Sequence, residues 1–451
     1  MDDAAKAQED VLAFLAEPAT YGRADKVLRI DTHAAAVFLA GDRALKVKRA
    51  VRFPFLDFST LEKRKRACEA EIEVNRRLAP KLYRGVVAVT RDSNGQLAIG
   101  GNGAPIEWAV DMVRFDENRT LDHLANEIDD DLADALGRAV AATHDKAPIV
   151  DAEPWIEALG AYIDEHVEAF AEHPGIFRAA DIKAHAEKSR AHYQRILPLL
   201  RDRGRRGLVR RIHGDLHLGN IVLIDGQPVL FDAIEFSDII GSGDVLYDLA
   251  FLLMDLFERK LPQAANIVLN RYLAETRRDE DLDALAALPF FLSMRAAIPK
   301  VMPGAVIVRS DIERKVLFGI AENEKLPADA YEEEVTARIY ATLTEKARRI
   351  VAAGHSAIVD AVFADPRERA GLEAMAKSAN IPLRGLFLTA DLDTRVARVG
   401  SRARDASDAD ASVARAQERY DLGPLEWTAV DASGTSAATL ARARAALPQL
   451  D

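Results

Sequence analysis

The chain has 451 residues, of which 49% are hydrophobic, and this length predicts two or three domains rather than one. Its net charge is −12, which disfavours nucleic acid as a partner because an acidic protein binds a phosphate backbone poorly. Cys68 is the only cysteine, so an internal disulfide and a cysteine-based metal cluster are excluded, and a reducing, cytoplasmic setting is favoured.

The amino-terminal segment, MDDAAKAQEDVLAFLAEPATYG, is acidic and amphipathic. It lacks the basic start and the apolar core of a secretory signal. The apolar run VLYDLAFLLMDLF is interrupted by Asp248 and Asp255 and is too short to span a bilayer. We therefore expect a cytoplasmic protein with no membrane partner.

The first 115 residues indicate a small sheet with one main helix. Residues 26–50 alternate in polarity and break at GDR, which predicts three strands joined by two turns. Residues 59–79 have helical spacing and begin at a possible cap, Ser59. GVVAVTR and IEWAVDMVRF indicate two further strands.

From residue 116 the pattern becomes helical, and it stays so to about residue 298 except for two short strands around the turn DGQP. Beyond that point AVIVRSD, SAIVDAVF, LRGLFLTA and WTAVDAS alternate with helical segments, which is typical of a parallel α/β unit. We expect an α/β and α+β multidomain protein. Residues 1–115 and 116–298 form the two lobes of one domain, and residues 299–451 form the other.

The segment RIHGDLHLGNIVLIDGQPVLFDAIEF contains the polar groups that phosphoryl transfer needs. That reaction requires a base for the acceptor hydroxyl and Mg²⁺ ions on the nucleotide phosphates, and Mg²⁺ prefers oxygen ligands. Asp215 can be the base, and Asn220 and Asp232 can be ligands. The spacing from Asp215 to Asn220 equals that of the protein-kinase loop H-R-D-x-x-x-x-N, with Gly214 in place of Arg.

HGDLHLGN followed by FDAIEF resembles the aminoglycoside phosphotransferase family, which has a protein-kinase-like bilobal fold. The resemblance covers roughly Lys26 to Ile298. It implies that ATP is the phosphate donor, that Asp215 is the catalytic base and that Asn220 and Asp232 hold Mg²⁺. By the same resemblance Glu235 supports the metal shell.

The two histidines of the motif have different expected roles. His213 belongs to the catalytic set, and we expect it to brace the loop through hydrogen bonds rather than to carry protons. His217 is open between packing within the loop and contact with the substrate.

The nucleotide end of the site requires a strand lysine and a helix glutamate. Lys46 and Lys48 point to the same face of a strand because strand periodicity is two. RALK is similar to the strand lysine of the family, which favours Lys46 and leaves Lys48 as a solvated edge charge. Glu71 is favoured over Glu69 because it precedes Leu78 by seven residues, as in relatives.

The glycine-rich motif G-x-G-x-x-G is absent, and DTHAAAVFLAG occupies the corresponding hairpin. The small residues 34–36 would still let backbone N–H groups approach an anion. VDMVRF is the expected hinge between the lobes, with the backbone of Asp111, Met112 and Val113 facing adenine.

Residues 304–451 resemble a P-loop small-molecule kinase such as gluconate or shikimate kinase. Fusion of such a unit to a kinase-like domain is similar to a bacterial group described as an aminoglycoside phosphotransferase fused to an ATP-binding protein. The resemblance implies substrate-side, Walker-B-type and lid residues at Asp311, Arg314, Asp360, Arg398 and Arg402.

The C-terminal unit nevertheless lacks its central motif. G-x-x-x-x-G-K-[ST] is absent from the sequence, and only AAIPKVMPG precedes the strand AVIVRSD. That segment is too short for a strand, a loop and a helix, which need about 30 residues. We therefore expect a truncated, degenerate P-loop-type unit that does not hydrolyse ATP by itself.

The expected function is ATP-dependent transfer of a phosphoryl group to a hydroxyl of a small molecule, such as an amino sugar, a sugar or a metabolite. A non-catalytic nucleotide sensor is the alternative, but a sensor has no need of a base at Asp215. Protein kinase activity is less favoured because no A-P-E segment follows Asp232.

Overall fold

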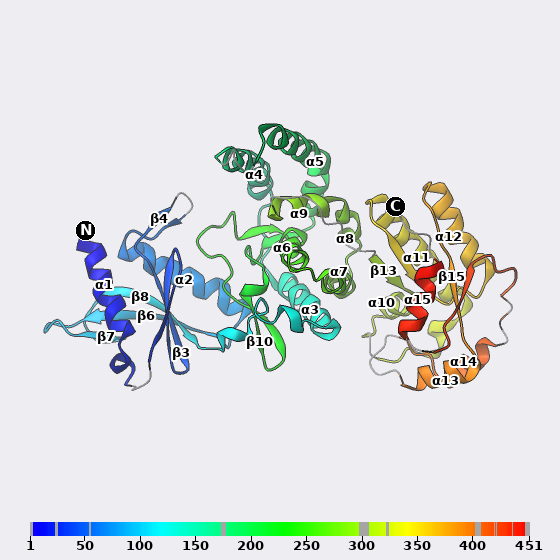
Figure 1. The fold of residues 1–451 in the computed structure, drawn as a ribbon, viewed down its shortest axis with the longest axis horizontal. Helices are drawn as coiled ribbons and strands as arrows, with labels where there is room; N and C mark the ends of the chain where they lie inside the picture. The colour runs from blue at the N-terminus through cyan, green and yellow to red at the C-terminus, as the bar shows by residue number, and fades with distance from the viewer. Residues whose placement is uncertain are drawn as a thin grey trace. The chain divides into compact units, whose positions relative to one another are not determined.

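The computed structural model describes residues 3–22, 26–53, 56–172, 177–296, 306–321, 324–401, 407–418, 420, 422–434 and 436–446. The chain divides into two compact units (Figure 1). Residues 1–276 and 287–303 form the first unit, and residues 277–286 and 304–451 form the second. The expected domain boundaries at residues 115 and 298 stay predictions.

The first unit begins with a six-stranded antiparallel sheet in the order β1-β2-β3-β8-β6-β7. Its strands are β1 (Leu28–Asp31), β2 (Ala35–Ala40), β3 (Arg43–Lys48), β6 (Tyr83–Arg91), β7 (Leu97–Ile99) and β8 (Ala104–Val113). A short hairpin of β4 (Arg52–Phe53) and β5 (Leu56–Asp57) follows β3. These strands confirm the prediction of a small amino-terminal sheet.

Two helices cover opposite faces of this sheet. The helix α1 (Asp3–Ala16) packs with Leu45 and Val47 of β3 in one core cluster. The helix α2 (Leu61–Leu78) packs against the other face, where Ala44 lies. The cap of α2 is Thr60, whose hydroxyl accepts from the N–H of Lys63, so the prediction of Ser59 was wrong by one residue.

The rest of the first unit is mainly helical, as predicted. Its helices are α3 (Asp130–Lys146), α4 (Glu153–Ala171), α5 (Ala179–Arg205), α6 (Val245–Glu258), α7 (Pro262–Thr276) and α9 (Leu288–Ala296). The hairpin β10 (Ile221–Ile224) and β11 (Gln227–Leu230) turns at residues 225 and 226, and β9 (Val209–Arg211) pairs with β12 (Ser242–Asp244). These two pairs carry the segment that the sequence singled out. A sheet with one main helix followed by a mainly helical part agrees with the bilobal arrangement that was predicted.

The second unit contains two pairs of parallel strands, as predicted for an α/β unit. The strand β13 (Val306–Arg309) pairs with β14 (Ala357–Asp360), and β15 (Leu386–Thr389) pairs with β16 (Thr428–Asp431). Its helices are α8 (Asp279–Ala284), α10 (Ser310–Phe318), α11 (Glu333–Ala352), α12 (Pro366–Ser378), α13 (Leu392–Ser401), α14 (Ala411–Gln417) and α15 (Ser436–Ala446).

Within the described ranges, no helix is long and apolar enough to cross a membrane.

Candidate active site

The loop between β9 and β10 holds Asp215 and Asn220 against each other. The side-chain nitrogen of Asn220 donates to the backbone oxygen and to Oδ2 of Asp215, both at 2.9 Å. Nε2 of His217 lies 3.4 Å from the same carboxylate oxygen, and the ring nitrogen Nδ1 of His217 accepts from the N–H of Gly219. The loop therefore presents one carboxylate with polar donors arranged around it.

His213 links this loop to the end of β11. Its Nε2 donates to the backbone oxygen of Phe231 at 2.8 Å, and its Nδ1 accepts from the N–H of Asp215 at 3.4 Å. The ring is buried, and burial lowers the pKa of His213 below its ordinary value. A neutral imidazole that uses both nitrogens in this way braces the loop, in keeping with the role expected of it.

Asp248 of α6 binds the backbone of the loop between β9 and β10. This fully buried carboxylate accepts from the backbone N–H groups of His213 and Gly214 at 2.9 and 3.0 Å. His144 of α3 places its Nε2 at 3.1 Å from the same group. Asp255, farther along the same helix, accepts from the N–H of Leu218 at 2.8 Å.

Sequence reasoning did not predict that Asp248 and Asp255 would hold this loop. The two aspartates inside the apolar run VLYDLAFLLMDLF were nevertheless a signal, because a buried carboxylate needs hydrogen-bond partners.

Asp232 begins a loop whose backbone forms hydrogen bonds with side chains of the amino-terminal lobe. Its backbone has a φ of 60°, in the left-handed region that residues other than glycine rarely adopt. The hydroxyl of Tyr83 accepts from its N–H at 3.1 Å. Asn75 of α2 exchanges two hydrogen bonds with the backbone of Ala233, at 3.0 and 2.7 Å. Together these contacts hold Asp232 in its unusual backbone conformation. No local sequence pattern predicted them.

Arg211 holds the continuation of this loop. Its guanidinium donates to the backbone oxygens of Ile234, Ser237 and Asp238. The N–H of Ile234 in turn donates to the backbone oxygen of His213 at 2.9 Å. The segment after Asp232 is thus attached to its surroundings through its main chain.

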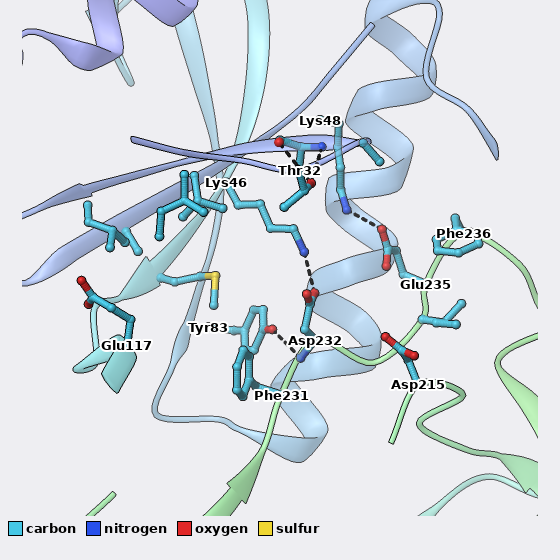
Figure 2. A pocket seen from close by; sticks show the side chains of 18 of the residues that line it. Thr32, Lys46, Lys48, Tyr83, Glu117, Asp215, Phe231, Asp232, Glu235 and Phe236 are labelled. Carbon is cyan, nitrogen blue, oxygen red and sulfur yellow. Dashed lines mark hydrogen bonds and ion pairs between the residues drawn. The ribbon is translucent and has the colours of Figure 1, made fainter. Parts of the chain in front are cut away.

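Lys46 and Glu71 meet as predicted. Nζ of Lys46 lies 3.0 Å from Oε1 of Glu71 and 2.5 Å from Oδ1 of Asp232, and Figure 2 shows the lysine reaching toward Asp232. Glu69 instead pairs with Lys65 on the exposed side of α2, at 3.7 Å. The structure therefore selects Glu71 as the glutamate that contacts the strand lysine.

Lys48 is not the solvated edge charge that was expected. It is 3% exposed, and it forms ion pairs with Oε2 of Glu71 and with Oε1 of Glu235. The physical reason is that both faces of β3 are covered, since Leu45 and Val47 pack toward α1 and the lysines face α2. Strand periodicity correctly placed the two lysines on one face, but it could not reveal their depth.

A cavity of about 540 Å³ lies beside the two strand lysines (Figure 2). Lys46, Lys48, Asp215, Asp232 and Glu235 line its charged end. Its remaining walls are mostly apolar and come from β1, β2, the β4–β5 hairpin, β8 with the segment after it, and the loop after β11. The apolar contributors include Ile30, Val37, Leu39, Leu56, Phe58, Met112, Phe115, Phe231 and Phe236. An apolar chamber with convergent charged groups at one end suits an aromatic base joined to an anionic tail.

The expected hinge contributes to this cavity in part. Met112 lines it, as do Arg114, Phe115 and Glu117 just beyond β8. The side chain of Asp111 is turned to a bidentate pair with Arg43, with distances of 2.9 and 3.1 Å. Asp111 and Val113 are not among the lining residues. Contact between this backbone and adenine stays a prediction.

The charges in the cavity stabilise one another. Burial alone would raise the pKa of Asp232, but the charge and hydrogen bond of Lys46, together with the charges of Lys48 and His213, outweigh burial and the pKa is lowered. Burial alone would lower the pKa of Lys46, but Asp232 and Glu71 hold it well above its ordinary value. For Asp215, burial is opposed by the hydrogen bond and charge of His217, and its pKa is also lowered. The cavity therefore carries ionised lysines and carboxylates at neutral pH.

The donor set fits a hard divalent cation. Asp215 and Asp232 bring carboxylate oxygens to the cavity, and Asn220 lies beside Asp215 with its amide oxygen not used on that residue. Among the described residues, no three His, Cys, Asp or Glu side chains are grouped so that they could hold an ion by themselves. Such a site suits Mg²⁺, which is commonly bound by one or two carboxylates together with nucleotide phosphates.

The expected residues of the second unit are engaged in internal contacts. Asp360 pairs with Arg309 at the ends of two parallel strands, at 3.1 Å. Arg314 donates to the backbone oxygen of Ala330, and Arg398 donates to that of Gly434 at 2.6 Å. The remaining two are Asp311, which also has a partner, and Arg402, which lies outside the described residues.

Two family models match the chain. The model described as Phosphotransferase enzyme family matches residues 25–288, and one described as AAA domain matches residues 296–421. The first match covers more than half of the chain, so the protein belongs to the phosphotransferase enzyme family. The family predicted from HGDLHLGN and FDAIEF is thereby confirmed, and the second match lies in the carboxyl-terminal part of the chain that the sequence set apart from it.

The chain is also similar to individual proteins. Uncharacterized proteins of Mycobacterium tuberculosis and Mycobacterium bovis are 26% identical to it over 459 residues, which cover 87% of this chain and 90% of theirs. A choline/ethanolamine kinase family protein of Mesorhizobium loti superposes with a TM-score of 0.40 at 14% identity, over 77% of this chain and 99% of that one. An aminoglycoside phosphotransferase of Streptomyces rimosus gives 0.36 at 19% identity, over 64% and 99%.

Proposed function

We propose that this phosphotransferase moves the γ-phosphate of ATP to a hydroxyl of a small molecule, in the presence of Mg²⁺. The observation that carries the proposal is the connected set of Lys46, Glu71 and Asp232 in the same cavity as Asp215. The first three suit the phosphate end of a nucleotide, and Asp215 is placed to orient an acceptor.

Each residue then has a defined task. Asp215 receives the proton of the attacking hydroxyl at a carboxylate oxygen, while Asn220 and His217 hold that carboxylate in place. Lys46, kept in position by Glu71, contacts the α- and β-phosphates. Asp232 and Asn220 would hold Mg²⁺, which neutralises charge on the transferred phosphoryl group when it is bound.

The acceptor is proposed to be an amino sugar, a sugar or another metabolite alcohol rather than a polypeptide. Only residues 233–244 separate Asp232 from α6, and this leaves little loop on which a peptide could lie. The net charge of −12 disfavours nucleic acid as a partner and favours a neutral or cationic molecule. Because the one cysteine is unpaired, we further propose a cytoplasmic location.

A screen of acceptors tests this function. ATP consumption by the full chain is measured with a panel of sugars, amino sugars and aminoglycosides, and the product is identified by mass spectrometry. Asp215→Asn serves as the blank because it keeps the shape of the side chain and removes the base. Acceptor-dependent turnover that the blank lacks is the expected result. ATP binding without turnover on any acceptor would favour the alternative, a nucleotide sensor.

A further inference from the structure

Lys48 occupies a second ion-pair site beside that of Lys46. Its ammonium group lies between Oε2 of Glu71 and Oε1 of Glu235, and it stands 5.4 Å from the ring centre of Phe58. The side chains of Lys48, Glu71 and Glu235 are 4%, 0% and 5% exposed. A lysine buried to this degree must be paired, so its two carboxylate partners are a structural requirement.

The pairing has a simple order. Each oxygen of Glu71 takes one lysine, and each lysine continues to one acidic residue of the loop after β11. Lys46 continues to Asp232, and Lys48 continues to Glu235 (Figure 2). Glu71 of α2 is therefore linked to the loop after β11 through two lysines rather than one.

The two connections differ in their access to the cavity. The side chain of Asp232 is 40% exposed, so a cation can reach its free oxygen. The side chain of Glu235 is 5% exposed and is held by Lys48. A carboxylate that is both buried and paired with a lysine is a poor ligand, because a cation would have to give up its water to reach it and would also compete with the ammonium group.

We propose that Lys48 is a positioning residue that keeps Glu235 out of the metal shell by holding its carboxylate in a buried ion pair. The cation would then be held by Asp232 and Asn220, and the role of Glu235 would be to anchor Lys48. This inference rests on the proposed function, because it concerns how the same site takes Mg²⁺ and ATP.

Calorimetric titration of ATP into the full chain at a series of Mg²⁺ concentrations tests the inference without an acceptor. In Lys48→Met the carboxylate of Glu235 is released, and an additional anionic oxygen strengthens Mg²⁺ binding. We expect the Mg²⁺ concentration at half-maximal ATP affinity to fall by about threefold or more. Glu235→Gln, which leaves Lys48 paired with Glu71, is expected to keep the wild-type Mg²⁺ dependence to within about twofold.

The double variant Lys48→Met/Glu235→Gln is expected to restore the wild-type dependence, because no carboxylate is then released. Lys65→Met is the matched control, since Lys65 forms an exposed pair with Glu69 on the same helix. An unchanged dependence in Lys48→Met would overturn the inference. So would a rise in the required Mg²⁺ in Glu235→Gln, because Glu235 would then be a ligand.

Urea unfolding of Glu235→Gln, without metal or nucleotide, covers the case in which Lys48→Met does not fold. Where Lys48→Met and the double variant fold, their unfolding also gives the coupling between Lys48 and Glu235. We expect Glu235→Gln to unfold at a lower urea concentration than the wild type, and an unchanged midpoint would overturn the pairing. A wild-type chain that binds no ATP at any Mg²⁺ concentration would contradict the proposed function itself, whereas the unfolding result would still decide whether Lys48 anchors Glu235.

Discussion

Asn220 uses its side-chain nitrogen twice on Asp215, once on the backbone oxygen and once on Oδ2, at 2.9 Å each. The amide is thereby oriented with its nitrogen toward Asp215, and its oxygen is the atom that remains for a cation. A single side chain thus fixes the proposed base and suits the expected metal ligand, which explains why a spacing of five residues is informative in this loop.

Asp215→Asn is expected to lower acceptor-dependent turnover at least about 100-fold, because a positioned base contributes roughly 10²–10⁴ to the rate. ATP affinity should change little, since the proposed function assigns Asp215 to the acceptor and Lys46 to the nucleotide. Steady-state kinetics and calorimetry measure the two quantities. Asp225→Asn, in the exposed turn of the neighbouring hairpin, is the matched control. Turnover at the wild-type rate in Asp215→Asn would remove Asp215 from the role of base.

Glu71→Gln is expected to lower the free energy of unfolding by about 3 kcal/mol, because it leaves the buried Lys48 and the half-buried Lys46 with one carboxylate fewer. Glu69→Gln, two residues away on the same helix, loses an exposed pair worth about 0.5 kcal/mol or less. Denaturant unfolding of both variants measures the difference. Equal losses would show that the network around Glu71 does not stabilise the fold.

The two histidines of the loop should titrate on opposite sides of the ordinary value of 6.5. Burial lowers the pKa of His213, whereas the hydrogen bond to Asp215 raises the pKa of His217. NMR titration of the imidazole signals tests the order. In Asp215→Asn the pKa of His217 should fall because its anionic partner is gone. A His217 pKa that is the same in both proteins would mean that the contact is absent in solution.

Cys68 is expected to be unreactive in the folded protein. It lies on the buried face of α2, and burial raises the pKa of its thiol to about 12, so the thiolate is scarce at pH 8. Absorbance after addition of a chromogenic disulfide should show a slow reaction that becomes fast in denaturant. Rapid modification of the native chain would indicate that the packing of α2 opens readily.

Nucleotide binding is expected to have a stoichiometry of one per chain, because the sequence offers no P-loop for the carboxyl-terminal unit. Lys46→Met in the full chain should therefore weaken ATP binding at the one site that exists. Calorimetry gives both the stoichiometry and the affinity. A second equivalent of ATP, or tight binding that survives Lys46→Met, would show that the second unit has an active nucleotide site.

The sequence allowed the local parts of the site to be predicted. Asp215 and Asn220 lie in one loop, and the hairpin of β10 and β11 leads from this loop to Asp232. The spacing of these three residues in the sequence was therefore enough to predict that they lie near one another. The preference for Glu71 over Glu69 also agrees with the structure, because the position along a helix determines which side chains face the sheet.

The parts that were missed depend on contacts between distant segments. Asn75 meets Ala233 across 158 residues, and Asp248 meets His213 across 35. Alternation along β3 gives the face on which Lys48 lies, but its burial depends on α2 and on the loop that carries Glu235. Information of that kind is tertiary and has no local pattern.

The main-chain attachments of residues 232–238 have a consequence for control of the enzyme. In many protein kinases the corresponding segment becomes ordered only after phosphorylation creates new pairs with arginine. Here Arg211 already binds three carbonyl oxygens of the segment, and Asn75 binds both backbone groups of Ala233. A chain produced in a foreign host, without any modifying partner, should therefore be competent as soon as it has folded, and its output should follow the supply of nucleotide and acceptor.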